Sequence, residues 1–526
     1  MKVTKEDVSP NKNYYKILAI ILIVLLLLAI GKTLFVHNQN IKWYINELFY
    51  RYDKNKKITI APPITTLSSY PASSSTLIND ASWINETNVA AVYQPTNSNE
   101  VKQLLAYAVN NHKQISLSGV RHSMGGQALL TNGLQLDMTK IDSVRYNTDK
   151  TVTVGPGATW KQIQDVLDPY GRSIQVMQDS NIFTVGGSLG VNAHGKDPRF
   201  GSIISTVNYF KIITWDGKEI LCSRTKNSEL FKSAIGGFGL FGVITEINLK
   251  TIENDNYSFS LNEIPTNNLL LQFEKVWKDP ATGLVEAHLS VDSNNFLADS
   301  LLYIYRKDTS LTNITTDTIG ENSVGLRKAV VDLSKTSNFG KLARWEIEKH
   351  VGGAIEPKTP TRNTAMAVPV RFLEHNDETT TDILQEYFIP KDKFNEFVSY
   401  YQTFIPNHKL NLVNVTVRKV SKDTEATVSY AKEDIYAFVV YYTVKKDNAD
   451  KEHLQSATME LIDFLNTIHG TYYLCYGPYF TSKQLMQMYP EMQKEMQLKN
   501  KYDPQNVFAN NWYEVIKNKY QAKDGM

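Results

Sequence analysis

Apolar runs and helical periods alternate over the part of the chain that follows residue 80. Between 81 and 145, an amphipathic stretch at 100–111 leads into short apolar runs at 114–117 and 134–137. Such short runs are typical of buried strands, and the stretch before them has the period of a helix. We therefore predict a β-α-β arrangement for this part.

The alternation continues from 146 to 255. An apolar strand at 151–154 precedes a helix at 160–167. Further along, the apolar run 210–215 and the run 219–221 flank Asp216-Gly217, a strong hairpin signal. The pattern over 81–255 predicts two α+β subdomains.

Residues 256–470 differ from the preceding part in that their strand-like apolar segments are longer. Strands are predicted at 301–305, 412–417 and 436–442, and helices at 391–404 and 451–468. An antiparallel sheet covered by helices is the simple interpretation.

A fourteen-residue apolar run, 17–30, lies between Lys16 and Lys32 near the N-terminus. If Lys32 snorkels, the apolar reach extends to Val36, about the 20 residues that span a bilayer. We predict an uncleaved membrane anchor; a cleaved signal peptide ending near Ala29-Ile30-Gly31 is the alternative. A slight excess of lysines before the span predicts a single-pass protein with its body on the extracytoplasmic side.

Composition excludes several classes of protein. Lys+Arg 56 against Asp+Glu 54 leaves a net charge of +2, so the chain has no large basic field for nucleic acid. The two cysteines, Cys222 and Cys475, lie far apart and are expected to be free thiols. No CxxC step occurs, which argues against an iron–sulfur cluster or a structural zinc.

Two glycine-rich loops carry the strongest chemical signal. In 118–126, three glycines let the backbone approach a ligand, and its N–H groups suit a diphosphate. Arg121 adds positive charge, and His122 adds a nucleophilic imidazole; a glycine turn with a surface histidine is the alternative. The second loop, 184–196, has four glycines and is too glycine-rich for a stable solvent-exposed helix. Two such loops suit a large nucleotide cofactor.

Six motifs in order resemble one family. Beside the two loops they are Val92-Tyr93-Gln94-Pro95, Gly155-Pro156-Gly157-Ala158-Thr159-Trp160, the stretch 236–245, and Tyr502-Asp503-Pro504 with the residues up to Phe508. The chain thus resembles the vanillyl-alcohol oxidase (p-cresol methylhydroxylase-type) flavoproteins over about 81–255 and 471–526. It is most similar to their aldonolactone oxidase and decaprenylphosphoryl-ribose oxidase branches.

The resemblance implies an α+β fold with a two-subdomain FAD-binding module and an inserted antiparallel-sheet substrate (cap) domain, preceded here by the predicted transmembrane helix. The expected parts are a cytoplasmic tail and anchor (1–38), a juxtamembrane segment and linker (39–80), the FAD-binding domain (81–255), the cap domain (256–470) and a C-terminal return to the FAD domain (471–526). The cofactor-binding residues that it implies are Ser118, Gly119, Val120, Arg121, His122, Ser123, Met124, Ser180, Gly186, Gly187, Ser188, Asn192, Gly195 and Ile244.

Histidines in both loops are implied to lie at the flavin. His122 stands where many family members bind the flavin covalently; the alternative is a histidine that only packs near the ring. His194-Gly195-Lys196 matches the ribose-oxidase branch, in which the histidine and lysine line the active site. The alternatives are a buried His194 that holds the loop through a backbone hydrogen bond, and a solvent-exposed Lys196.

The cap is implied to supply further site residues. Residues 385–390 resemble the strand over the flavin, and alternation puts Gln385 and Tyr387 on one face and Glu386 on the other. We predict Gln385 and Tyr387 as site residues, together with Arg418, whose alternative is a surface charge.

One position departs from the family. Where the relatives carry a lysine near the C-terminus, this chain has Tyr476, so the cation is missing or comes from Lys196 or Arg418. Tyr476 is a candidate to hydrogen-bond a substrate hydroxyl, but tyrosine is a poor base unless its pKa is lowered.

These features predict a membrane-anchored, FAD-dependent oxidoreductase that oxidises a CH–OH group of a sugar, sugar lactone, polyol or lipid-linked sugar. Electrons would pass to dioxygen or a quinone-like acceptor. A non-catalytic flavin-binding subunit of a membrane complex is the alternative. A nicotinamide dehydrogenase is disfavoured, since no Gly-x-Gly-x-x-Gly follows a first strand with an acidic residue further on.

Overall fold

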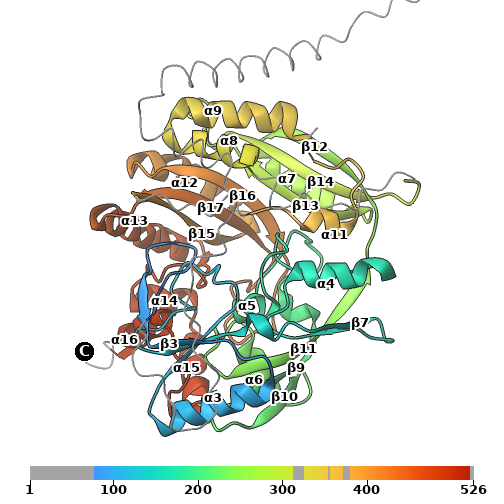
Figure 1. Cartoon of the computed structure of the whole chain (residues 1–526). Helices are drawn as coiled ribbons and strands as arrows, with labels where there is room; N and C mark the ends of the chain where they lie inside the picture. The colour runs from blue at the N-terminus through green and yellow to red at the C-terminus, as the bar shows by residue number, and fades with distance from the viewer. Residues whose placement is uncertain (1–75, 312–324, 354–355, 371–378, 522–526) are drawn as a thin grey trace, which may run out of the picture.

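The computed structural model describes residues 76–311, 325–353, 356–370 and 379–521 (Figure 1). The predicted membrane anchor within 1–38 lies outside these residues. Within the described ranges, no helix has the length and apolar character needed to cross a bilayer. Two predicted boundaries differ. Residues 76–78, which we assigned to the linker 39–80, form strand β1 (Thr76–Ile78), paired with β2 (Thr87–Val89). Residues 471–472, which we assigned to the C-terminal return 471–526, form strand β18 (Thr471–Tyr472) of the cap sheet.

The first subdomain is a three-stranded parallel sheet with a helix beside it, at the bottom of Figure 1. Its elements are β3 (Ala91–Tyr93), α3 (Ser98–Asn110), β4 (Ile115–Ser118) and β5 (Leu134–Asp137). The helix begins after Asn97 because that side chain accepts hydrogen bonds from two backbone N–H groups of the first turn. The predicted β-α-β arrangement is present.

The second subdomain is a six-stranded antiparallel sheet. Its elements are β6 (Val144–Tyr146), β7 (Thr151–Val154), α4 (Trp160–Leu167), β8 (Arg172–Ile174), α5 (Val185–Gly190), β9 (Val207–Ile213), β10 (Glu219–Ser223), α6 (Ser228–Ala234) and β11 (Val243–Glu253). Helix α4 has the predicted bounds because Thr159 and Gln162 form a capping box. The predicted hairpin also forms, with Ile213 opposite Glu219.

Helix α5 lies inside the stretch 184–196, where we predicted a loop too rich in glycine for an exposed helix. The helix is instead buried through Val185, Ser188 and Leu189. Its glycines permit a close approach, because a Cβ on Gly186 would lie 2.8 Å from the Pro156 Cβ. Tertiary packing therefore stabilises a short helix that its propensity alone would not.

The third part is a seven-stranded antiparallel sheet, as predicted for the cap. In spatial order its strands are β12 (Tyr257–Pro265), β14 (Asp299–Lys307), β13 (Thr282–Leu289), β16 (Leu412–Val420), β17 (Ile435–Lys445), β15 (Thr380–Pro390) and β18 (Thr471–Tyr472).

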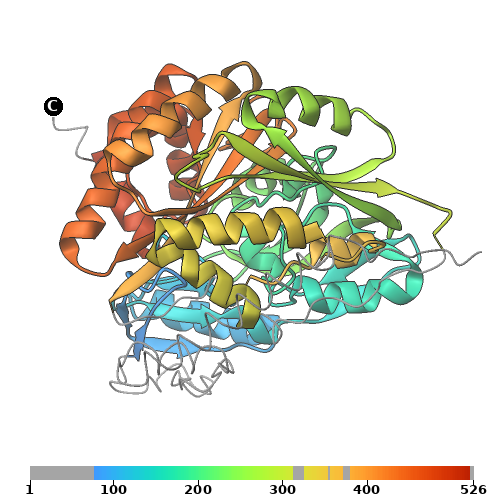
Figure 2. The ribbon, with the colours of Figure 1, turned by 90° about the horizontal axis from the view of Figure 1, so that it is seen from above.

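The two faces of this sheet have different neighbours (Figure 2). Helices α7 (Thr266–Trp277), α12 (Phe394–Asn407) and α13 (Asn448–Thr467) cover one face, where the Tyr436 hydroxyl donates to Glu274 of α7 at 2.6 Å. On the other face, α8 (Gly325–Thr336) and α9 (Asn338–Ile347) cover one part, and Arg344 of α9 donates to Asn414 at 2.6 Å. The rest of that second face is turned towards the two subdomains.

The end of the chain returns to the first subdomain. Phe508 forms a parallel bridge with Ile115, and the Asp503 carboxylate accepts the backbone N–H groups of Val507 and Phe508 at 2.9 and 2.8 Å. The remaining α-helices of the described residues are α11 (Arg362–Met366), α14 (Ser482–Met488), α15 (Met492–Tyr502) and α16 (Asn511–Gln521). Short 3-10 helices lie at Met138–Lys140, Asp168–Tyr170, Ile203–Thr206 and Lys391–Lys393, and a π-helical turn lies at Glu348–Gly352.

Candidate active site

The two glycine-rich stretches lie against each other. A Cβ added to Gly119 would lie 1.9 Å from the Thr184 Oγ1, so the first loop touches the start of the second without room for a side chain. Next to this contact, the His122 ring stands edge-on to the Phe183 ring, with the centroids 5.0 Å apart. The fold thus brings together the two stretches that we predicted to hold one cofactor.

Polar groups around this contact fit a ligand rich in oxygen atoms. The buried hydroxyls of Ser118, Ser123 and Ser180 have no hydrogen-bond partner among the described residues. Buried hydroxyls normally find one, so a ligand is the simplest candidate. Arg121 and Ser180 also have φ of 57° and 144°, a backbone strain that concentrates at ligand sites. These residues fit the diphosphate and ribityl oxygens of FAD.

Other predicted cofactor ligands have partners within the protein. The Ser188 hydroxyl donates to the Thr184 carbonyl at 3.0 Å and accepts from the Trp160 indole at 3.1 Å. Its hydrogen bonds are therefore satisfied within the protein. Met124 accepts the Leu384 N–H at its sulfur, 3.3 Å away. Ile244 pairs with Ile212 in the sheet. The cofactor contacts of these residues stay predictions, as do those of Val120, Gly186, Gly187, Asn192 and Gly195.

We expect Gly119→Ala to separate the two loops and to lower the flavin content of the purified protein at least tenfold. The added methyl group would overlap the Thr184 side chain, whose β-branched shape leaves it little freedom to move. Flavin absorbance per mole of protein measures the effect. Gly352→Ala is the control, because its Cβ would meet only ordinary contacts at 3.7 and 3.8 Å. Equal flavin content in the two variants would contradict this view of the contact.

His194 meets a carboxylate of the cap. Its Nε2 lies 2.5 Å from the Glu386 Oε1, and its Nδ1 lies 3.2 Å from the Gly195 carbonyl oxygen. Both side chains are 4% exposed. Two lone pairs would repel each other at 2.5 Å, so Nε2 donates its N–H to the Glu386 carboxylate, and Nδ1 faces the Gly195 carbonyl. His194 therefore both holds its loop, which was our alternative for it, and forms a buried acid–base pair.

The face of β15 that meets His194 is not the one we predicted. Gln385 and Tyr387 point to the opposite face, where Gln385 donates to Thr458 of α13 at 3.0 Å and accepts a hydrogen bond from the Tyr387 hydroxyl. Side chains alternate along a strand, so Glu386 is the residue of this segment that points to the two subdomains. Glu386, and not Gln385 or Tyr387 as we predicted, is therefore the residue of this strand that lies at the candidate site.

Four buried charges form a closed ion-pair network beside this pair. Lys196 lies 3.1 Å from Asp179 and 3.2 Å from Glu286, while Arg418 lies 2.8 Å from Asp179 and 3.0 Å from Glu286. The side chain of Lys196 is 1% exposed and that of Arg418 is 14% exposed. Solvent exposure of Lys196 and a surface role of Arg418, our alternatives, are therefore wrong.

The cations of this network are stabilised by their carboxylates, but burial outweighs the two cations at Asp179 and raises the pKa of that carboxyl. Burial opposes the charge on Lys196, but Asp179 and Glu286 outweigh it and raise the Lys196 pKa. Burial likewise opposes the charge on Arg418, whose pKa Glu286 and Asp179 raise. For Glu286, burial is outweighed by Lys196 and Arg418, which lower its pKa to about 2. Lys196 therefore stays protonated and is not available as a base.

The C-terminal segment closes the site from a third direction. A Cβ on Gly125 would lie 2.4 Å from the Tyr476 carbonyl oxygen, so this segment packs on the first loop. Burial raises the pKa of Tyr476 well above its usual value, so its phenol donates hydrogen bonds and does not act as a base. Burial also raises the pKa of Cys475, which is a free thiol like Cys222, as predicted.

Asp179, Glu286 and Glu386 are candidate site residues that we did not predict. Strand alternation had placed Glu386 on the face opposite Gln385 and Tyr387, and Glu286 left a signal as an acidic residue inside the mostly apolar run 284–289. Asp179 shows nothing in the sequence that distinguishes it from a surface aspartate.

A known family is similar to this chain over the residues that contain the two glycine-rich stretches, and one known protein is similar to it over most of its length. Residues 89–223 match a family described as FAD binding domain. Cytokinin dehydrogenase 2 of Arabidopsis thaliana is 33% identical over 184 residues, which are 34% of this chain and 37% of that protein. L-gulonolactone oxidase of Mus musculus is 21% identical over 438 residues, 81% of this chain and 94% of that protein. The Bos taurus L-gulonolactone oxidase is 29% identical over 162 residues, 30% of this chain and 37% of that protein.

The chain thus spans little more than a third of the plant dehydrogenase but nearly the whole mouse oxidase. FAD as the cofactor, predicted from the two loops, is confirmed by the matched domain. The gulonolactone oxidases support the predicted aldonolactone oxidase branch. The likeness of His194-Gly195-Lys196 to the ribose-oxidase branch stays a prediction.

Proposed function

Because the chain belongs to the FAD-linked oxidoreductases with a p-cresol methylhydroxylase-type FAD-binding domain, we propose that it oxidises a CH–OH group of a sugar, sugar lactone or polyol. The observation that carries the proposal is the buried His194–Glu386 pair, which joins the second loop to the cap sheet. Bound FAD supplies the acceptor for a hydride, and the chain must place the substrate and take the hydroxyl proton.

Glu386 is the proposed proton acceptor. As the C–H bond gives up its hydride, the hydroxyl oxygen forms a carbonyl and its proton passes to the carboxylate. His194 orients that carboxylate by donating its Nε2–H to Oε1, which leaves Oε2 to take the substrate proton, while the Gly195 carbonyl lies against Nδ1 of the ring. Burial of both groups excludes water, which strengthens their interaction with each other and with a substrate hydroxyl.

The network of Lys196, Arg418, Asp179 and Glu286 supports an uncharged substrate. Each of the two cations already lies in two ion pairs with carboxylates of the protein, so neither is left to pair with a substrate anion. Tyr476 stands where relatives supply a further lysine, so it adds a hydroxyl group and no charge. A neutral, hydroxyl-rich molecule suits this lining better than a phosphorylated or carboxylated one.

The experiment that tests the proposal is anaerobic bleaching of the flavin absorbance on addition of candidate substrates. Aldonolactones, alditols and neutral aldoses are the first set, and sugar phosphates and uronic acids are the charged comparison. Bleaching by the neutral set supports the proposal, and bleaching by charged compounds alone contradicts the inference about the lining.

A non-catalytic flavin-binding subunit is the second candidate. It is favoured by Tyr476 in place of the family's lysine and by the closed ion-pair network. A flavin that dithionite reduces but that no member of a broad CH–OH panel bleaches would favour this candidate.

Covalent attachment of the flavin through His122 is part of the proposal. The residue stands in the first loop at the contact with the second, against Phe183. We expect flavin to remain with the acid-precipitated protein and to appear in the supernatant of His122→Ala. Absorbance of the pellet and supernatant, with the mass of the intact chain, measures this. Flavin released from the unchanged protein would show that binding is non-covalent.

We also propose that the apolar segment 17–36 anchors the enzyme in a membrane with its body on the extracytoplasmic side. An anchor would place the site near lipid-linked sugars and near a quinone-like acceptor. Dioxygen is the other proposed acceptor, and consumption of oxygen during turnover distinguishes the two.

A further inference from the structure

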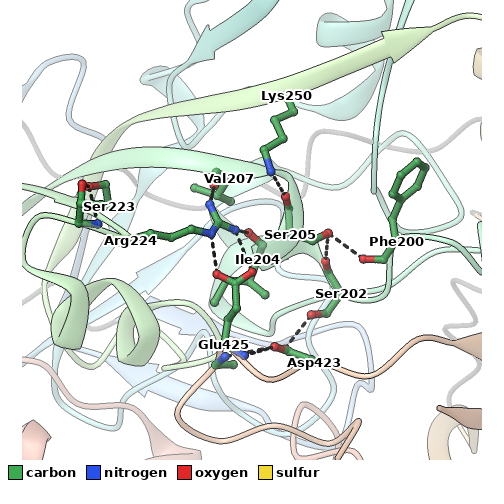
Figure 3. A network of polar contacts seen from close by, with 12 residues as sticks. Phe200, Ser202, Ile204, Ser205, Val207, Ser223, Arg224, Lys250, Asp423 and Glu425 are labelled. Carbon is green, nitrogen blue, oxygen red and sulfur yellow. Dashed lines mark hydrogen bonds and ion pairs between the residues drawn. The ribbon is translucent and has the colours of Figure 1, made fainter. Parts of the chain in front are cut away.

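A loop of the cap reaches across to the second subdomain. Residues 421–431, part of the connection between β16 and β17, are called the clasp loop. Figure 3 shows two of its carboxylates, Asp423 and Glu425, pointing towards the second subdomain. Glu425 pairs with Arg224 at 2.6 Å, and Arg224 also donates to the Val207 and Ile204 carbonyls. The clasp loop therefore joins parts of the chain that are about two hundred residues apart in sequence.

Asp423 makes the more buried contacts. Its Oδ2 accepts hydrogen bonds from the Asn192 side-chain amide and the Ser202 hydroxyl, both at 2.8 Å. Its Oδ1 accepts the backbone N–H groups of Glu425 and Ala426 at 2.8 and 3.2 Å. The residue is 7% exposed. One carboxylate thus satisfies four donors, two in its own loop and two in the second subdomain.

The two donors of the second subdomain stand at the ends of one short segment. Residues 192–202 begin with Asn192 and end with Ser202, and they carry His194 and Lys196 between them. The ends are held together by Asp423 and by an antiparallel bridge between His194 and Ser202. Asn192 also has a φ of 50°, which its side-chain and backbone contacts must maintain.

A second contact from the clasp loop holds the same residue. The Tyr430 hydroxyl donates to the Asn192 carbonyl at 2.8 Å. The Asn192 side-chain oxygen in turn accepts the Ile204 N–H at 3.3 Å. Asn192 is therefore held on both sides, with its amide group oriented so that the NH2 faces Asp423.

We propose that Asp423 is a positioning residue of the cap, which sets the place of His194 and Lys196 by holding both ends of the segment 192–202. The chemical role of His194 rests on the proposed function, but the positioning itself does not. Through Asp423, the cap orders part of the cofactor domain in addition to its proposed role in substrate binding.

Asp423→Asn is the most informative variant because it keeps the shape of the side chain while it removes the charge and replaces one acceptor oxygen with an NH2 donor. All four groups donate to the carboxylate, and only the Ser202 hydroxyl can also accept, so the new NH2 group must face at least one group that can only donate. Leaving such a buried donor unsatisfied is expected to make amide hydrogen exchange in 192–204 about tenfold faster, with exchange in 436–442 unchanged. Exchange is read by mass spectrometry on the protein as isolated with its flavin, and the visible flavin spectrum is expected to change.

The reciprocal double variant, Asn192→Asp combined with Asp423→Asn, is expected to restore both readouts. In it, the amide introduced at position 423 donates across the contact to the carboxylate introduced at position 192, and the amide oxygen accepts the N–H groups of Glu425 and Ala426. The second oxygen of the new carboxylate accepts the Ile204 N–H. A role in overall stability alone predicts no such rescue, because the double variant changes one more buried residue than the single one.

Glu425→Gln is the matched control in the same loop. Its pair with Arg224 is about one-third exposed on both sides, and Arg224 keeps its two carbonyl partners. We expect unchanged exchange in 192–204 and an unchanged flavin spectrum.

Two outcomes would overturn the proposal: Asp423→Asn with wild-type exchange in 192–204, or a double variant no better than the single one. Neither readout needs a substrate. Failure to find a CH–OH substrate would therefore count against the proposed function and leave the test of Asp423 intact.

Discussion

Glu386→Gln is expected to lower kcat by about 10²- to 10⁴-fold while the flavin content stays that of the wild type. Glutamine keeps the size of the side chain and a hydrogen bond to His194 Nε2, but it cannot accept the proton of the substrate hydroxyl. Because the change removes a proton acceptor and little binding surface, the loss should appear in kcat more than in KM. The measurement is steady-state turnover with the first substrate found to bleach the flavin.

The neighbouring residue supplies the control. Tyr387→Phe removes a hydroxyl that contacts Gln385 on the opposite face of β15. We expect turnover within about twofold of the wild type and a loss of stability of about 1 kcal/mol. The opposite result, with turnover lost in Tyr387→Phe and kept in Glu386→Gln, would show that the other face of β15 meets the substrate.

Glu495→Gln is expected to stabilise the protein at pH 8 and to leave its stability near pH 5 unchanged. Glu495 lies in α15, 9% exposed, and its Oε2 has no hydrogen-bond partner among the described residues. Burial raises its pKa to about 8, against a smaller lowering by Ser233 and Lys494. It lines a small, mostly apolar cavity with Phe238, Met492 and Trp512.

The direction of the pH effect follows from proton binding. Between pH 5 and 8, the folded state holds the Glu495 proton and the unfolded state does not, so stability falls as the pH rises. Over about three pH units, at about 1.4 kcal/mol each, the loss is at most about 4 kcal/mol. Glutamine stays neutral at every pH and escapes this loss.

Denaturant unfolding of both proteins at pH 5 and pH 8 measures the effect. Glu491→Gln, at the start of the same helix with a side chain 43% exposed, is the matched control and should leave the pH dependence as it is. A parallel pH dependence of the wild type and Glu495→Gln would show that this carboxyl does not titrate as its burial implies.

Local signals in the sequence determine much of the fold. Helix α4 has its predicted bounds because Thr159 and Gln162 cap it from within the same few residues. The β9–β10 hairpin forms because Asp216-Gly217 favours the turn that the two apolar runs need. The glycines of the two loops are also a local signal, because a glycine by itself gives the backbone the conformational freedom to approach a ligand closely. They therefore indicated a nucleotide cofactor without any knowledge of the tertiary structure.

Only the tertiary structure decided which side chains meet. Glu386 rather than Gln385 or Tyr387 faces His194, because a shift of one residue along a strand reverses the face and alternation alone does not show which face is inward. The ion pairs of Lys196 with Asp179 and Glu286 join three distant segments, and no local pattern encodes such a contact. Helix α5 likewise forms against its glycine content because neighbouring segments bury it. For this protein, the sequence alone indicated the FAD cofactor and most elements, while the long-range packing of the cap decided which side chains meet at the candidate site.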